Sequence, residues 1–337
     1  MIRSFFLRSS ALPVGLLALG VMMACGGSAP PPEAPEDPSL VDEGDASPSG
    51  AQASPKVAEG RQAIGAGDFA RARGVLEQAV LEAPGDAQAH FYLAVALEGV
   101  QEPDKAAEEY RAAIAADRQL VDAYVNLSAL LLDSGAAKES VAVADDGLAI
   151  ASQHPDLLTN RALALEAEGR LEEALSAYGK AADVASGNHE LRFAYADLLA
   201  RTDKPAQAKA QLKQLIDSSS DARVLAAAGH LLATLGSYAE CVSAYGKALE
   251  TTSEPQLLVR RGLCRHELKD ETGARADFEK ALAADPKNAP AHYYLGRYYA
   301  SVKKKQQACA HLQKAAELGE GAVVQSARGA ANKLGCQ

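Results

Sequence analysis

Cysteine is the residue type in this chain best suited to covalent or metal chemistry, and there are five cysteines among 337 residues. Four of them, Cys241, Cys264, Cys309 and Cys336, lie in the last third of the chain. Four thiols allow three disulfide pairings. Cys264 and His266 look like a pair of metal ligands, but residues two apart on a helix point about 200° apart. We therefore expect disulfides and no metal site, with buried free thiols as the alternative.

No pattern in the sequence predicts catalysis. The chain has no glycine-rich phosphate loop, no Gly-x-Ser-x-Gly turn, no His-Glu-x-x-His and no Walker-type lysine. Its Asp and Glu residues follow the polar faces of expected helices and the turns between them. We therefore expect neither enzymatic activity nor a cofactor, with an enzyme whose site has an unrecognised pattern as an alternative.

The first 24 residues have the pattern of an export signal. Arg3 and Arg8 form a positively charged start. They precede a mostly apolar run, residues 9–24, that is shorter than the roughly 20 residues a membrane-spanning helix requires. The run ends at Cys25 and resembles the lipobox of bacterial lipoproteins, although Met22 stands where Leu is usual. The resemblance implies that Cys25 becomes the lipid-modified first residue of the mature chain. An ordinary secretory signal with a chance cysteine is the alternative.

Residues 25–52 then form the lipidated cysteine and a tether. From Gly26 to Pro55 the chain is rich in Gly, Ala, Pro and Ser, is acidic, and has no Lys or Arg. Such a segment does not bury a core and is expected to be extended and self-repelling. In lipoproteins, a residue other than Asp after the cysteine, here Gly26, implies export to the outer membrane. Several acyl chains give a stable anchor where one is marginal.

The net charge excludes two classes of partner. The whole chain has 34 basic and 44 acidic residues. Without Arg3 and Arg8 the mature chain keeps 32 basic residues, a net charge near −12. This balance argues against nucleic acid and anionic membrane surfaces as partners, so we expect membrane attachment through the N-terminal lipid.

The rest of the chain is organised by a small residue that returns every 33 or 34 positions. A fixed period of this length is typical of stacked helical hairpins. The positions are Ala72, Ala106, Ser140, Ala174, Ala208, Cys241, Ala274 and Ala308. Twelve residues before each stands another small residue, and four residues after most of them stands a bulky one that shares its helix face. The pattern predicts an all-α solenoid of antiparallel helix pairs.

The repeat resembles the tetratricopeptide repeat family. The runs Gly67-Asp68-Phe69 with Ala72, and Gly236-Ser237-Tyr238 with Cys241, match the turn of the family's 34-residue helix–turn–helix unit. The resemblance implies eight units over residues 53–321 and a capping helix within residues 322–337. The units are expected to begin near Ala53, Ala87, Val121, Pro155, His189, Ala222, Pro255 and Ala289. The fifth unit is the poorest, because Asp203-Lys204-Pro205 replaces the glycine turn.

The repeat geometry selects one disulfide pairing. In an antiparallel stack, the start of one unit's second helix lies beside the end of the next unit's first helix. Cys241 and Cys264 occupy these two places, and Cys309 and Cys336 are related in nearly the same way. We therefore predict the disulfides Cys241–Cys264 and Cys309–Cys336, which would clamp the C-terminal third of the array.

The inner face of such an array is formed by first-helix residues that point away from the second helices. Its aromatic members are candidate anchors for a peptide, with closure of the superhelix as the structural alternative. Asparagines repeating at 34 residues hold a ligand's backbone in some family members, although Asn is also common there for structural reasons. The candidate partner-binding residues are Phe91, Val95, Asn126, Asn160, Phe193, Asp197, Tyr293 and Arg297.

Together these features predict a lipid-anchored scaffold on the bacterial outer membrane, facing the periplasm, that binds protein partners or peptide segments of the envelope. By layout the chain looks most like lipoproteins that help to assemble envelope machinery, such as secretin pilotins of type IV pili and helper subunits of outer-membrane protein insertion. The alternative is a regulatory or substrate-presenting subunit of an envelope enzyme such as a peptidoglycan hydrolase or synthase. The sequence leaves the partner and the oligomeric state open.

Overall fold

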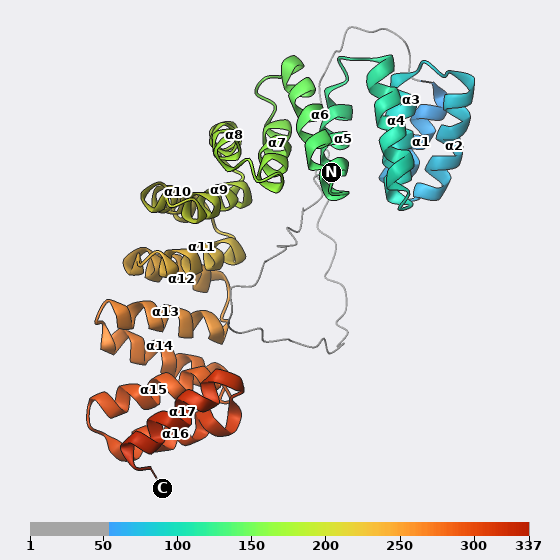
Figure 1. Cartoon of the computed structure of the whole chain (residues 1–337). Helices are drawn as coiled ribbons and strands as arrows, with labels where there is room; N and C mark the ends of the chain where they lie inside the picture. Colours follow the sequence, from blue (N-terminus) through green and yellow to red (C-terminus); the bar gives the residue numbers. More distant parts are fainter. Residues whose placement is uncertain (1–53, 337) are drawn as a thin grey trace, which may run out of the picture. The chain divides into compact units, whose positions relative to one another are not determined.

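The structure, a computed structural model, describes residues 54–336, so the predicted export signal and tether lie outside the described residues (Figure 1). The described part contains seventeen α-helices and no strand. The helices are α1 (Pro55–Gly65), α2 (Phe69–Glu82), α3 (Ala87–Gly99), α4 (Pro103–Ala116), α5 (Val121–Asp133), α6 (Ala137–Ile150), α7 (Pro155–Ala167), α8 (Leu171–Val184), α9 (His189–Arg201), α10 (Pro205–Ser218), α11 (Ala222–Thr234), α12 (Tyr238–Thr251), α13 (Pro255–Glu267), α14 (Glu271–Ala284), α15 (Ala289–Ser301), α16 (Lys305–Leu318) and α17 (Gly321–Leu334).

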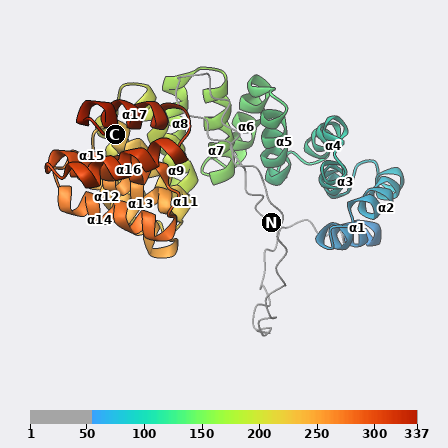
Figure 2. The ribbon, with the colours of Figure 1, turned by 90° about the horizontal axis from the view of Figure 1, so that it is seen from below.

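Each odd-numbered helix from α1 to α15 pairs with the helix that follows it, and each pair packs on the next pair along the chain (Figure 2). The last helix, α17, packs on α16 and α15. First helices of neighbouring units also contact one another, as α5 contacts α7. The prediction of an all-α solenoid is confirmed. Seven first helices, α3 to α15, begin at the residue where the sequence period places the start of a unit.

The periodic small residues lie in the core. All eight are at most 2% exposed. Twelve residues earlier, at Gly262, an added Cβ would lie 2.6 Å from Phe278 Cε1, and at Gly296 it would lie 2.7 Å from Leu312 Cγ. The small residue of the first helix therefore makes room for the bulky residue of the second helix, sixteen positions later.

The turn inside every unit uses one left-handed residue. Four of these positions are glycines, with φ between 68° and 79° at Gly67, Gly135, Gly169 and Gly236. Gly67 and Gly236 are the two in the turn runs that the sequence indicated. The other four are Gln101, Asp203, Lys269 and Lys303, with φ between 57° and 67°. The fifth unit therefore makes the same turn at Asp203 without glycine, and α10 begins two residues later at Pro205, where proline suits a helix start.

Both predicted cysteine pairs are joined in the structure. Cys241 of α12 pairs with Cys264 of α13, with Cα atoms 6.3 Å apart. Cys309 of α16 pairs with Cys336, which follows α17, with Cα atoms 5.4 Å apart. The first bridge links adjacent units, and the second fastens the end of the capping helix to the last unit.

The capping helix α17 closes the array as the sequence indicates. Ala327 and Ala331 are buried on its inner side, while Arg328 and Lys333 are exposed. The helix ends at Leu334, and the following Gly335 is left-handed with φ 62° and donates its N–H to the Ala331 carbonyl. Among residues 54–336, no helix combines the length and the apolar character needed to cross a membrane.

Candidate partner-binding surface

The N-terminal members of the predicted inner face belong to the core. Phe91 is 9% exposed, and its ring lies 5.1 Å from the Tyr92 ring and 5.8 Å from the Tyr110 ring. Val95 is partly buried against the same cluster. Phe91 therefore has little surface left for a partner, and the structural interpretation describes it better than the peptide-anchor interpretation.

The side-chain amide groups of both candidate asparagines are hydrogen-bonded within the chain. Asn126 Nδ2 donates to the Tyr110 hydroxyl at 3.1 Å. Asn160, which is 8% exposed, donates from Nδ2 to the Val125 carbonyl at 3.0 Å and to Ser128 Oγ at 2.9 Å. Because a buried donor without a partner is costly, these bonds favour a structural role for the two asparagines over contact with a ligand's backbone.

The middle of the predicted face is partly buried and internally paired. Phe193 packs against the core of units five to seven. Asp197 accepts from Arg201 Nε at 2.9 Å, and Arg201 also pairs with Glu166. Glu166 in turn accepts from the Tyr178 hydroxyl at 2.7 Å. Burial and the Glu166 charge together raise the pKa of Tyr178, so its hydroxyl stays a donor.

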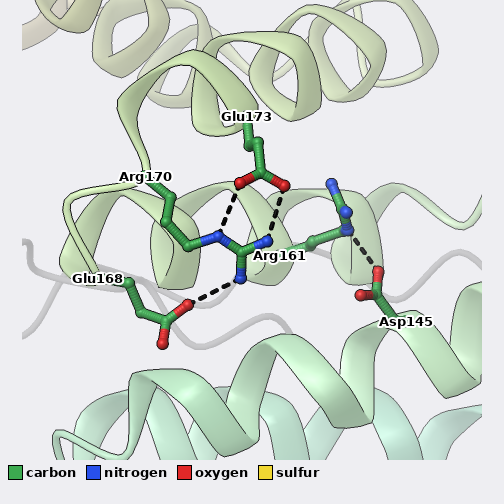
Figure 3. A network of polar contacts seen from close by, with 5 residues as sticks. All are labelled: Asp145, Arg161, Glu168, Arg170 and Glu173. Atoms are coloured by element: carbon green, nitrogen blue, oxygen red, sulfur yellow. Dashed lines mark hydrogen bonds and ion pairs between the residues drawn. The ribbon is translucent and has the colours of Figure 1, made fainter.

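Surface charges of the middle units are matched in the same way (Figure 3). Arg170, at the turn between α7 and α8, donates to both carboxylate oxygens of Glu173 at 2.8 and 2.7 Å and to Glu168 at 3.0 Å. Arg161 of α7 donates to Asp145 of α6 at 2.5 Å. The hydrogen bonds from Arg170 lower the pKa of Glu173. Each of these five charged side chains therefore already has a partner of opposite charge within the chain.

The C-terminal members of the predicted face are different, because they remain accessible. Tyr293 is partly buried and packs edge-on against Tyr294, with ring centroids 5.0 Å apart. Arg297 is exposed, and its guanidinium carbon lies 5.8 Å from the centroid of the Tyr293 ring. Within the described residues, no carboxylate lies within ion-pair distance of Arg297. A cation on an aromatic surface without an anionic partner is a natural contact point for another molecule.

Arg297 borders a hollow between α13, α14 and α15, which we call the tyrosine–arginine hollow. Its volume is about 100 Å³. It is lined by His266, Glu271, Ala274, Arg275, Phe278, Tyr294, Arg297, Tyr298 and Ser301.

The walls of the hollow are fixed by stacked rings. The Phe278 and Tyr294 rings are stacked 5.5 Å apart, and the Arg275 guanidinium carbon lies 5.8 Å from the centroid of the Tyr298 ring. Burial raises the pKa of Tyr294, which keeps this phenol neutral. On the rim, His266 Nδ1 lies 2.8 Å from a Glu271 carboxylate oxygen.

The sequence interpretation included Tyr293 and Arg297 but missed Arg275, Tyr294 and Tyr298. Arg275 lies on α14, the second helix of its unit, whereas the predicted inner face was restricted to residues of first helices. A local signal was available, because four of the chain's eleven tyrosines lie at positions 293, 294, 298 and 299. Across residues 54–336, no group of three or more His, Cys, Asp or Glu side chains is arranged to hold a metal ion.

Known sequence families match most of the array. The tetratricopeptide repeat pattern matches residues 57–121 and 226–289, a second pattern of the same description matches 165–231, and a third matches 278–310. Together these matches cover more than half of the 337 residues. The chain belongs to the tetratricopeptide repeat family.

Several solved structures are similar to this chain at low sequence identity. PilF of Pseudomonas aeruginosa is 20% identical, with 57% of this chain and 88% of that chain covered and a TM-score of 0.49. YrrB, described as a TPR protein with an unusual peptide-binding site, is 19% identical, with 55% and 96% covered and a TM-score of 0.45. A tetratricopeptide repeat protein of Parabacteroides merdae is 17% identical, with 74% and 98% covered and a TM-score of 0.44.

Proposed function

We propose that this protein is a lipid-anchored scaffold of the bacterial envelope that captures a protein partner at the tyrosine–arginine hollow. The observation that carries the binding site is Arg297, an exposed guanidinium on the Tyr293 ring without a carboxylate partner in the described residues. Tyr and Arg are the residue types that carry most binding energy in protein interfaces. The other inner-face candidates are buried, packed partly buried against the core, or internally bonded.

Charge indicates what the partner presents at this place. Arg297 and Arg275 stand at one hollow, and Glu271 on the rim is already paired with His266. Arg275 Nε lies 3.6 Å from the nearest Glu279 oxygen, which is a loose contact compared with the bidentate pairs elsewhere. A partner segment with a carboxylate beside an aromatic or aliphatic side chain would satisfy both the guanidinium groups and the rings.

Partner capture is tested by in-cell cross-linking and mass spectrometry of the full chain. Arg297→Ala combined with Tyr298→Ala is expected to reduce the yield of the specific cross-linked partner at least tenfold. Arg328→Ala on the exposed side of α17 is the matched control and is expected to leave the yield unchanged. Equal yields for all three proteins would move the binding site away from this hollow.

Anchoring rests on Cys25 and the segment before it. Cys25→Ala is expected to move the protein from the membrane fraction to the soluble fraction. Separation of inner and outer membranes on a density gradient then checks the proposed outer-membrane location. Protein that stays on membranes after Cys25→Ala would contradict the lipid anchor, without affecting the proposed binding site.

The captured partner decides what the scaffold assembles. We propose assistance to an envelope machine, in the manner of a pilotin or an outer-membrane insertion helper, and this finer role rests on the layout of signal, tether and repeats. Recovery of components of a secretion or insertion machine supports it. Recovery of a peptidoglycan hydrolase or synthase alone would contradict it.

A further inference from the structure

The negative charge of the chain is not spread evenly along the array. Residues 54–188, which form the first four units, include 11 basic and 22 acidic residues, and residues 189–254 include 7 and 8. In residues 255–337 the balance is reversed, with 14 basic and 8 acidic residues. Electrostatic attraction between exposed charges is screened beyond about 8 Å at physiological ionic strength. The total charge therefore does not exclude an anionic surface as a partner of the C-terminal units.

Two neighbouring turns of these units present a lysine beside an exposed aliphatic residue. In the turn between α13 and α14, Leu268 is 46% exposed and is followed by Lys269 with φ 65°. One repeat later, between α15 and α16, Val302 is 44% exposed and is followed by Lys303 with φ 61°. The turns lie next to each other, because side chains adjacent to both of them line the tyrosine–arginine hollow. Among the described residues, no other unit has a large exposed aliphatic residue at this position.

Further lysines lie at the same end of the last unit. Lys304 and Lys305 continue the second turn, and both are exposed. The disulfide Cys309–Cys336 fastens the end of α17 beside the start of α16, and Lys305 Nζ lies 3.5 Å from the place that a Cβ added at Gly335 would take. Lys333, in the last turn of α17, is exposed at this end as well. Within the described residues, no carboxylate lies within ion-pair distance of Lys269, Lys303, Lys304, Lys305 or Lys333. We call these five lysines, with Leu268 and Val302, the lysine edge.

The composition of the lysine edge favours a lipid surface over a protein partner. Protein interfaces are enriched in aromatic residues and Arg and are depleted in Lys, and the tyrosine–arginine hollow has that composition. The lysine edge combines Lys with single aliphatic side chains and includes no aromatic residue and no Arg. Near a bilayer, lysines are attracted by anionic headgroups, and aliphatic side chains enter the boundary between headgroups and acyl chains.

We propose that the lysine edge docks on the surface of a bilayer that contains anionic phospholipids. The same surface repels the first four units, so the C-terminal end is the part of the array that approaches it. Docking holds the tyrosine–arginine hollow, which borders both turns, close to the bilayer. The contact requires neither a lipid on Cys25 nor a bound partner. It therefore goes beyond the proposed function, and either proposal can fail alone.

A single indole can report on this contact, because the chain contains no tryptophan. Val302→Trp and Leu268→Trp place the indole on the lysine edge, and Leu81→Trp, at a 72% exposed position of α2, is the matched control. Each is made in the full chain with Cys25→Ala and mixed with vesicles of equal parts phosphatidylcholine and phosphatidylglycerol. We expect a blue shift of the emission and quenching by brominated acyl chains at both edge positions, and neither effect in Leu81→Trp. Vesicles of phosphatidylcholine alone are expected to leave all three spectra unchanged.

Substitution of the lysines tests the electrostatic part of the contact. Lys303→Gln, Lys304→Gln and Lys305→Gln are combined in the Val302→Trp protein, and vesicle titration of the indole emission is expected to show binding weakened about a hundredfold. Glutamine suits the left-handed position of Lys303, because Gln101 occupies it in the second unit. Far-ultraviolet circular dichroism of this variant should therefore match that of the parent. The matched control, expected to keep its affinity, replaces with Gln three exposed lysines of earlier units, Lys138, Lys180 and Lys213.

The indole reports on its own surroundings, so attachment of the chain through another segment does not imitate docking of the lysine edge. An unshifted emission at both edge positions, an equal shift in Leu81→Trp, or unchanged binding after loss of the three lysines would each overturn the proposal. A shift caused by polyglutamate but not by anionic vesicles would assign the edge to an acidic protein segment and would overturn it too.

Discussion

Arg261 of α13 holds both carboxylate oxygens of Asp277 on α14. Its Nε donates to Oδ2 at 2.9 Å and its Nη2 donates to Oδ1 at 2.7 Å, while the Asp277 side chain is 1% exposed. Arg265 Nη1 adds a third contact, 2.8 Å from Oδ2. The equivalent residues of several other units are apolar, such as Val75 and Ala177. The seventh unit, which forms part of the tyrosine–arginine hollow, is therefore joined internally by charge as well as by packing.

Asp277→Asn is expected to destabilise this unit strongly. The substitution leaves the largely buried Arg261 without its counter-charge, and breaking one side of a buried pair costs about 3–5 kcal/mol. Long repeat arrays unfold in segments, so the loss is best measured by hydrogen exchange of the α13 and α14 amides. Glu139→Gln removes the exposed pair with Arg111 and is expected to cost less than about 1 kcal/mol. Similar losses in both variants would contradict a special role for Asp277.

Two glycine-to-alanine substitutions are expected to change stability in opposite directions. At Gly262 the new methyl group would meet the buried Phe278 ring at 2.6 Å, so we expect a loss of about 1–3 kcal/mol. At Gly74, inside α2, nothing lies within 4 Å of the added Cβ, and alanine should stabilise the helix by about 0.5–1 kcal/mol. Urea denaturation of the two proteins followed by circular dichroism measures both changes. A stabilised Gly262→Ala protein would mean that Phe278 can move away.

His230 is expected to make the sixth unit sensitive to acid. Arg260 Nη1 donates to His230 Nδ1 at 3.2 Å, and burial together with the Arg260 charge lowers the pKa of His230 below its ordinary 6.5. Just below pH 6.5, His230 is therefore protonated in the unfolded chain but still neutral in the folded chain. The stability that comes from keeping His230 neutral is fully present above pH 6.5 and is lost as the pH falls toward the folded-state pKa of His230.

Nuclear magnetic resonance titration of the His230 ring measures this shift. Arg260→Gln removes the nearby positive charge and is expected to raise the pKa of His230, although burial, the larger cause, should keep it below 6.5. The pH dependence of stability between pH 7.5 and 5.5 should become weaker in the variant. A pKa at or above 6.5 in the parent protein would contradict both the burial and the charge effect.

The periodic core was predictable because its constraints are local and repeat. Most units need a small residue such as Ala94 or Gly262 at one phase and a bulky residue sixteen positions later, so the sequence contains the same pairing many times. The left-handed turns at Lys269 and Lys303 were harder to foresee, since no glycine marks them. At these two turns the packing of the helix pair imposes a positive φ, although lysine favours a negative φ.

The candidate site was predictable only in part. The position of a residue within the repeat tells in which direction its side chain points, but it does not tell which side chains lie there. Phe91 has the phase of the inner face, yet Tyr92 and Tyr110 cover it. Asn126 has a polar amide at the surface phase, but the Tyr110 hydroxyl of the preceding unit takes it. Conversely, Arg275 reaches the hollow from a second helix. These contacts depend on the lengths of side chains in adjacent units, and the repeat period gives no information on those lengths.

The two disulfides are expected to form in an oxidising environment and to stabilise the C-terminal end of the array. Cys241 and Cys264 are 23 residues apart and Cys309 and Cys336 are 27 apart, which gives about 3 kcal/mol for each bridge in the chain-entropy description. Intact-mass measurement after alkylation, with and without reductant, should find these four thiols blocked until reduction. The double substitution Cys241→Ala with Cys264→Ala isolates the first bridge, because alanine already occupies the position of Cys241 in six of the other units.

This variant should lose stability in α12 and α13 by hydrogen exchange while α1 to α6 keep their protection, since the bridge joins only neighbouring units. Adding reductant to the parent should reproduce the effect there and also loosen α16 and α17. Four alkylatable thiols in the unreduced protein would instead show that Cys241 and its three counterparts serve as small core residues. Loss of protection throughout the array would contradict a purely local clamp.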